Sequence, residues 1–174
     1  MKKKFLIVVV LAVLAAAFST PAVIYAEPDA IIRSLEQEAA ESALAENEKP
    51  VFSPPLDGII TSRFGYRKSG FHHGLDIAND WGTNVGAIAD GTVIEAGWKS
   101  SVYGYAVVID HGSGWQSLYG HCGMLTVKVG QQVQTGDVIA IEGSTGRSTG
   151  PHVHLEIIKD GVYLDPEDFV SVRE

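Results

Sequence analysis

Two stretches of sequence decide the fold: HVHLEII at residues 152–158 and DVIAI at residues 137–141. Short runs of β-branched and other apolar residues are typical of strands. Four further runs have the same character and are separated by glycine turns: 91–94, 106–109, 115–119 and 127–129. No helix-length periodic segment interrupts them. The sequence therefore predicts a mainly β domain, an antiparallel sheet or sandwich of about 120 residues.

The composition excludes two classes of protein, nucleic-acid binders and domains held by intrachain disulfides. The chain has 174 residues, of which 45% are hydrophobic and 20% charged, as in an ordinary soluble domain. Acidic residues exceed basic ones by 21 to 13, giving a formal charge of −8, which is the wrong sign for a nucleic-acid binder. We expect no nucleic-acid partner. Because Cys122 is the single cysteine, an intrachain disulfide is excluded, and a core or a metal must stabilise the fold.

The N-terminus, residues 1–26, has the layout of an export signal. Three lysines precede an unbroken apolar run from Phe5 to Phe18, and Ala26 offers a cleavage site. Read through to Ala26, the apolar stretch has 22 residues and is also long enough to be an uncleaved membrane anchor. Both interpretations place the remainder of the chain outside the cytoplasm, since the lysines stay on the cytoplasmic side.

Residues 27–50 form an acidic segment. It carries seven acidic residues against Arg33 and Lys49, with alanine-rich spacing and few large apolar residues. This composition predicts a short solvated helix that acts as a linker. Pro50, Pro54 and Pro55 mark its end, so the domain is predicted to span residues 51–174.

Histidines and carboxylates gather at two places in this domain. The first is the stretch 72–76, HHGLD, and the second is the pair His152 and His154. Residues two apart in a strand face the same side, which suits one imidazole on a metal and the other beside a bound water or substrate. Glycines around His72 and Asp76 favour a turn that brings the two together. Two imidazoles and a carboxylate suit zinc and leave a fourth position for water.

Five segments, taken in order, resemble the lysostaphin-like (LytM-type) zinc metallopeptidases, which cut peptides in bacterial cell-wall peptidoglycan. They are 62–67 (SRFGYR), 72–76 (HHGLD), 89–93 (ADGTV), 118–121 (LYGH) and 148–154 (STGPHVH). The resemblance covers roughly residues 52–168 and implies an antiparallel β-fold with a groove over one zinc ion.

The resemblance also implies roles for five residues. His72, Asp76 and His154 would bind the zinc, and His121 and His152 would be the catalytic pair. Zinc lowers the pKa of a bound water and polarises a carbonyl, so one histidine could take a proton while the other stabilises the developing charge or protonates the leaving amine. The residues alone do not assign those two tasks singly.

Several neighbouring residues have more than one interpretation. Arg63 and Arg67 are either surface or structural cations, or they recognise a substrate carboxylate. Tyr119 either lines the groove on the same strand face as His121 or packs in the core. His73 would replace His72 as ligand if the register were shifted by one, although the His-x-Gly-x-Asp pattern favours His72. Cys122 is interpreted as small core filler.

Other functions remain as alternatives to a zinc endopeptidase. The first is a catalytically idle LytM-type module that regulates other cell-wall hydrolases or joins an envelope complex; the complete set of five site residues argues against it. A biotinyl or lipoyl carrier is suggested by residues 127–140, but Lys128 lies within an apolar alternation and not at a hairpin tip. A thiol peptidase would need Cys122 beside a histidine base, which strand geometry opposes.

Overall fold

The structure, a computed structural model, describes residues 31–37, 50–68 and 70–173. The chain divides into two compact units, Met1–Ala45 and Glu46–Glu174. Residues 31–37 are helical and fall within the predicted linker, whereas the predicted signal or anchor at 1–26 lies outside the described residues. Among the described residues, no helix is long and apolar enough to span a membrane.

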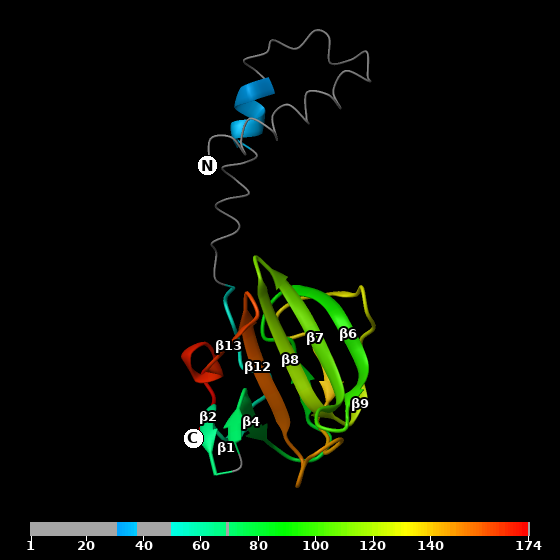
Figure 1. Cartoon of the computed structure of the whole chain (residues 1–174). Coiled ribbons are helices and arrows are strands. Elements are labelled where there is room, and N and C mark those ends of the chain that lie inside the picture. Colours follow the sequence, from blue (N-terminus) through cyan, green and yellow to red (C-terminus); the bar gives the residue numbers. More distant parts are fainter. Residues whose placement is uncertain (1–30, 38–49, 69, 174) are drawn as a thin grey trace. The chain divides into compact units, whose positions relative to one another are not determined.

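The second unit is built on one large antiparallel sheet. Its strands follow the order β1-β4-β12-β8-β7-β6-β10, and β13 pairs with β12. Figure 1 shows β6, β7, β8 and β12 side by side. The bounds are β1 (Ile59–Ser62), β4 (Leu75–Ala78), β6 (Gly91–Ser100), β7 (Gly104–Gly112), β8 (Trp115–Cys122), β10 (Gln132–Val133), β12 (Val153–Lys159) and β13 (Val162–Leu164).

Two smaller antiparallel sheets complete the unit. One has the order β5 (Asn84–Gly86), β11 (Val138–Ile141), β9 (Met124–Leu125), and the other is the hairpin of β2 (Gly65–Arg67) and β3 (Gly70–His72). A 3-10 turn, η1 (Pro166–Asp168), follows β13 and is capped by the side chain of Asp165. The predicted mainly β, antiparallel fold is therefore confirmed.

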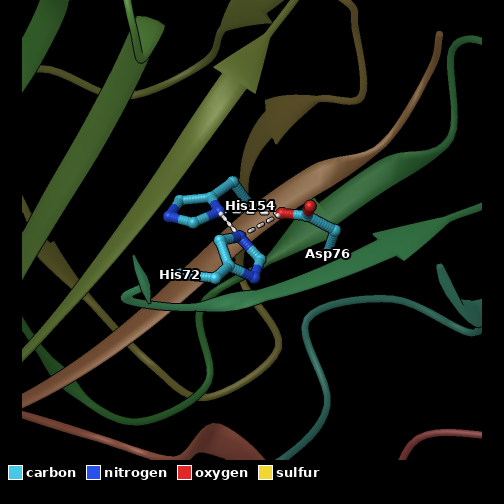
Figure 2. Close-up of side chains that lie close together, drawn as sticks. All are labelled: His72, Asp76 and His154. Atoms are coloured by element: carbon cyan, nitrogen blue, oxygen red, sulfur yellow. Dashed lines mark hydrogen bonds and ion pairs between the residues drawn. The ribbon is translucent and has the colours of Figure 1, made fainter. Parts of the chain in front are cut away.

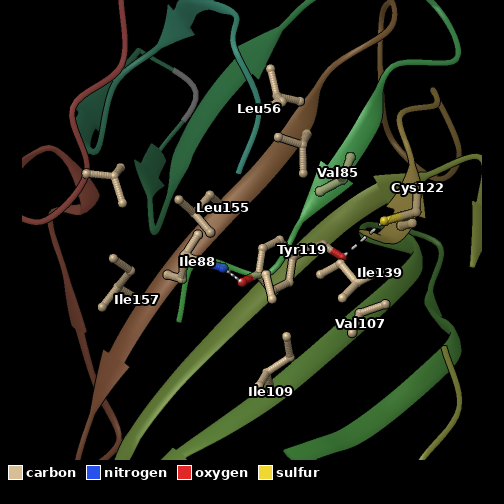
Figure 3. Packing of buried hydrophobic residues seen from close by; sticks show 14 of the residues in the cluster. Leu56, Val85, Ile88, Val107, Ile109, Tyr119, Cys122, Ile139, Leu155 and Ile157 are labelled. Atoms are coloured by element: carbon tan, nitrogen blue, oxygen red, sulfur yellow. Dashed lines mark hydrogen bonds between the residues drawn. The ribbon is translucent and has the colours of Figure 1, made fainter. Parts of the chain in front are cut away.

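Strand β12 is buried on both faces, and this arrangement positions the site. Its alternate apolar residues belong to the hydrophobic core: Val153, Leu155 and Ile157. The intervening residues, His154 and Glu156, are also buried and line a pocket. Successive side chains of a strand point to opposite faces, so one strand supplies both the core and the site. The core around these residues is drawn in Figure 3.

One predicted strand does not form. Residues 127–129 connect β9 to β10 without pairing as a strand. The Gly130 N–H donates to the Val93 carbonyl (2.8 Å) and the Gln131 N–H to the Lys128 carbonyl (3.1 Å), so the backbone turns here. The turn engages the Lys128 carbonyl and the N–H groups of Gly130 and Gln131, and residues 127–129 do not pair as a strand.

The end of β8 departs from regular alternation. Along β7 the partners change from Tyr105 opposite Cys122 to Val107 opposite Tyr119, which leaves Gly120 and His121 opposite a single residue. His121 has a positive φ of 62°. Such a bulge re-aims side chains, so Tyr119 and Cys122 both lie in the core while His121 turns into the pocket.

The prediction that Tyr119 lines the groove is therefore wrong. It assumed unbroken alternation from Tyr119 to His121, whereas Tyr119 is fully buried. Its hydroxyl accepts a hydrogen bond from the Ile88 N–H (2.8 Å), as Figure 3 shows, and another from the Ser117 hydroxyl (3.0 Å). Burial raises the pKa of the Tyr119 phenol, in keeping with a neutral group.

We expect Tyr119→Phe to destabilise the fold by about 1–3 kcal/mol, because the buried Ile88 N–H loses its acceptor. The measurement is denaturant unfolding monitored by tryptophan fluorescence. Tyr105→Phe is the matched control, since Tyr105 is 42% exposed, and it should change stability by no more than about 0.5 kcal/mol. Equal effects of the two substitutions would contradict the structural role given to Tyr119.

Candidate metal centre

Three potential ligand atoms converge beside β12. His72 Nε2 lies 3.1 Å from Asp76 Oδ1, His154 Nδ1 lies 2.8 Å from the same oxygen, and the two nitrogens are 3.0 Å apart. Figure 2 shows the three side chains pointing toward one another. Ligand atoms at about 2.0–2.1 Å from a tetrahedral zinc would lie about 3.3 Å apart, so this triangle is close to one face of such a site.

Outer hydrogen bonds set the orientation of both imidazoles. His72 Nδ1 lies 2.9 Å from the Arg63 carbonyl oxygen, which can only accept, so this nitrogen donates and leaves the lone pair on Nε2. His154 Nε2 lies 3.1 Å from Glu156 Oε1, so with Nε2 as the donor the neutral ring has its lone pair on Nδ1. The two lone pairs and the Asp76 carboxylate then face one point, which fits a divalent cation.

The strands fix this geometry. His154 on β12 is directly paired with Asp76 on β4, and His72 ends β3 just before the turn into β4. Gly74 in that turn packs against the His154 ring: a Cβ at this position would lie 2.7 Å from His154 Cε1. Glycine is therefore required at the centre of the His-x-Gly-x-Asp motif for the turn to approach the ring.

The site shifts the pKa of two of its members, Asp76 and His154. Burial alone would raise the pKa of Asp76, but hydrogen bonds from His154 and His72 outweigh it and hold the pKa well below its usual range. Burial alone would lower the pKa of His154, but Asp76 and Glu156 raise it to about 9. In the metal-free chain a proton on His154 thus occupies the position of a metal.

Metal affinity should consequently rise with pH. Protonated His154 stabilises the metal-free fold fully below its ordinary pKa of 6.5, and this contribution is lost as the pH rises through about 9. A metal must displace that proton, so we expect affinity to rise about tenfold per pH unit toward pH 9, with release below about pH 6. Competition titrations with a metallochromic indicator test this; an affinity independent of pH between 6 and 9 would contradict it.

Glu156 and Tyr103 form an outer layer that the sequence interpretation missed. The Tyr103 hydroxyl donates to Glu156 Oε1 (2.9 Å), the same oxygen that lies beside His154 Nε2. Glu156 is buried, and its second oxygen has no hydrogen-bond partner among the residues that the structure describes. The available signal was position: Glu156 is two residues after His154 and so shares its strand face.

We expect Glu156→Gln to lower metal affinity about 10-fold, because the uncharged amide is a weaker acceptor for His154 Nε2–H. The same competition titration measures it. Glu142→Gln is the matched control. Glu142 is also buried and, within the described ranges, has one oxygen without a partner, but its other oxygen accepts from the Asn79 N–H and not from a metal-site histidine. Equal losses in both variants would refute a specific role for Glu156.

His121 and His152 lie beside His72, Asp76 and His154, the metal triad, and their ring centroids are 4.6 Å apart. His121 Nδ1–H donates to the Thr145 carbonyl (2.8 Å), and His152 Nδ1–H donates to the Gly150 carbonyl (2.9 Å). Each ring therefore has its lone pair on Nε2. Burial, together with the neighbouring His152 and His154, lowers the pKa of His121 and keeps this ring neutral at neutral pH. The pair can thus accept protons.

The five residues expected from the sequence to bind the metal or carry protons all line one pocket of about 550 Å³. Arg67 also lines it; its guanidinium donates to the Ser62 hydroxyl (2.8 Å) and lies 4.0 Å from Asp76 Oδ2. The structure does not place Arg63 among the lining residues, because its side chain forms an ion pair with Glu167.

Two remaining alternatives are resolved by position. The His73 ring packs between Phe71 and Tyr163, at centroid distances of 5.0 and 4.6 Å, so the one-residue register shift is wrong. Cys122 is buried in the core, and burial raises the pKa of its thiol to about 12, which opposes a thiolate nucleophile.

This chain belongs to Peptidase family M23, whose sequence profile matches residues 70–166. The murein hydrolase activator EnvC of Escherichia coli is 39% identical over 119 residues, which are 67% of this chain and 28% of EnvC. The DD-carboxypeptidase/endopeptidase Mpg of Neisseria meningitidis is 42% identical over 113 residues, 62% of this chain and 26% of Mpg. The matching region thus spans about a quarter of these relatives.

Solved structures agree with the fold and the family. A zinc-containing peptidase from Vibrio cholerae is 35% identical with a TM-score of 0.62, over 68% of this chain and 39% of that chain. The catalytic domain of lysostaphin from Staphylococcus simulans is 31% identical with a TM-score of 0.60, over 64% of this chain and 91% of that chain. The resemblance to the lysostaphin-like peptidases is confirmed.

Proposed function

We propose that this protein is a zinc-dependent endopeptidase that hydrolyses peptide bonds in bacterial peptidoglycan. The observation that supports it best is the convergence of two imidazole lone pairs and a carboxylate, with separations of 2.8–3.1 Å, inside a pocket that also holds two further histidines. A structural zinc site would enclose the ion with four protein ligands, whereas three leave room for water. His72, Asp76 and His154 would hold one zinc ion per chain.

When bound, zinc polarises a carbonyl and lowers the pKa of a water ligand. The chain's own residues then move protons. His121 and His152 each have the lone pair on Nε2, so one ring can accept a proton from the attacking water and, once protonated there, give that proton to the leaving amine. The other ring can donate to the carbonyl oxygen only when its Nε2 carries a proton. The carbonyls of Thr145 and Gly150 hold these rings by their Nδ1–H groups.

Digestion of purified cell wall tests this function. The full-length chain should release new peptide termini, identified by mass spectrometry, and a chelator should abolish the release until zinc is restored. Peptide release that persists in the chelator would contradict a metal-dependent mechanism. Absence of new termini with a metal-loaded chain would contradict the endopeptidase itself.

A regulatory module is the second candidate, because the relative EnvC is named as an activator of murein hydrolases. Such a role would not require the metal ligands. The two functions separate when another hydrolase is added to cell wall together with a metal-free variant of this chain. Stimulation by that variant, with no cleavage by the loaded wild type, would favour the regulatory module.

We also propose that the domain acts outside the cytoplasm on peptidoglycan peptides, without a nucleic-acid partner. The lysines and apolar run of residues 1–26 support export, and the excess of acidic residues opposes nucleic-acid binding. A relative from Pseudomonas aeruginosa is named as a lipoprotein. Membrane association through the N-terminal segment would be seen as fractionation of the full chain with membranes.

A further inference from the structure

We infer that Arg147 binds a free carboxylate of the peptide substrate, and this inference rests on the proposed function. Arg147 lines the pocket on the loop between β11 and β12, the same loop that leads to His152. Its side chain is exposed. Within the described part of the chain, its guanidinium makes no hydrogen bond or ion pair, unlike that of Arg67.

The backbone beneath this guanidinium is anchored. The Arg147 N–H donates to the Val102 carbonyl (2.9 Å). Gly146, with φ of 71°, lies so close to the 102–104 segment that a Cβ there would be 2.7 Å from the Val102 oxygen. Both loops line the pocket, so they hold the base of the Arg147 side chain at its rim. A fixed base lowers the entropy lost when a ligand orders the side chain.

The acidic side chains that line the pocket do not pair with Arg147, so its guanidinium can bind an anionic ligand. The two acidic residues that line the pocket are already engaged: Asp76 with His72 and His154, and Glu156 with Tyr103 and His154. Residues 51–174 carry 14 acidic and 8 basic residues, so the domain as a whole repels anions. An anionic peptide therefore needs a local cation, and a guanidinium matches a carboxylate with two parallel hydrogen bonds.

The carboxylate could be the C-terminal one or a side-chain one, and synthetic substrates distinguish them. Peptides with the sequences found in cell-wall peptidoglycan are made with each carboxylate free or amidated in turn. We expect Arg147→Gln to lower kcat/KM about 10- to 100-fold for the peptide with the recognised carboxylate. For the peptide amidated at that position, Arg147→Gln should lower kcat/KM less than about threefold. For the wild type, amidation of that carboxylate should lower kcat/KM as much as the substitution lowers it for the free carboxylate.

Arg147→Lys and Lys128→Gln are the matched variants. Lysine keeps the charge but loses the paired hydrogen bonds, so it should restore only part of the loss. Lys128 is exposed and does not line the pocket, so its substitution should leave all peptides unaffected. Equal losses on free and amidated peptides, or a wild type indifferent to every amidation, would overturn the inference while leaving the endopeptidase intact.

Binding gives a readout that does not depend on turnover. Isothermal titration of the metal-free full-length chain with the same peptides should show about a 10-fold or greater weakening for Arg147→Gln, confined to the free carboxylate. If no peptide is cleaved but this difference appears, the proposed function fails and the carboxylate site stands. If peptides are cleaved and Arg147→Gln binds the free carboxylate as well as wild type does, the inference is refuted.

Discussion

His154→Ala should abolish metal binding and peptide cleavage together. The substitution removes one of three ligand atoms and leaves the carboxylates of Asp76 and Glu156 without their shared imidazole. We expect metal affinity to fall more than about 100-fold, beyond the effect of losing an outer partner. Because a bound metal supplies several kcal/mol of transition-state stabilisation, kcat/KM should fall more than about 1,000-fold. Elemental analysis and peptide release measure the two losses.

The adjacent histidine supplies the control for this loss. His73 is one residue from His72, but its ring packs against Phe71 and Tyr163 and does not join the triad. His73→Ala should therefore keep about one metal per chain. Denaturant unfolding of both variants separates ligand loss from misfolding. A His154→Ala chain that is folded and retains the metal would remove the basis of the proposed site.

In contrast to His154→Ala, His121→Asn should keep its full metal content while turnover falls about 100- to 10,000-fold. The lone pair of His121 Nε2 is lost, whereas the three ligand atoms stay in place. Asparagine is chosen because His121 has a φ of 62°, which asparagine tolerates better than alanine does. Elemental analysis and kcat for a defined peptide are the two measurements.

The second pocket histidine tests whether the pair acts as a unit. His152→Asn should resemble His121→Asn, and the double variant should lose little more than the more damaging single one if both serve the same steps. Fully multiplicative losses would indicate independent contributions. Loss of metal from a folded His121→Asn chain would show that His121 is a ligand and would overturn the division between ligands and proton carriers.

The fold class followed from local pattern alone. Apolar alternation in β12 buries Val153, Leu155 and Ile157, and glycines separate the strands, so a mainly β domain could be predicted from residues 137–141 and 152–158. Local composition also predicts the export segment and the acidic linker, and these two assignments remain predictions. Local reading failed at residues 127–129, where hydrogen bonds to Val93 and within the turn replaced strand pairing.

The candidate ligands were also predictable: a strand period places His152 and His154 on one face, and glycines favour a turn that joins His72 to Asp76. The family resemblance then implied which of these residues bind the metal. Only the tertiary structure decided three other matters. The bulge near His121 sent Tyr119 into the core, Glu167 drew Arg63 away from the pocket, and the loop before β12 brought Arg147 into it. These outcomes depend on pairing between residues distant in sequence, which no local period encodes.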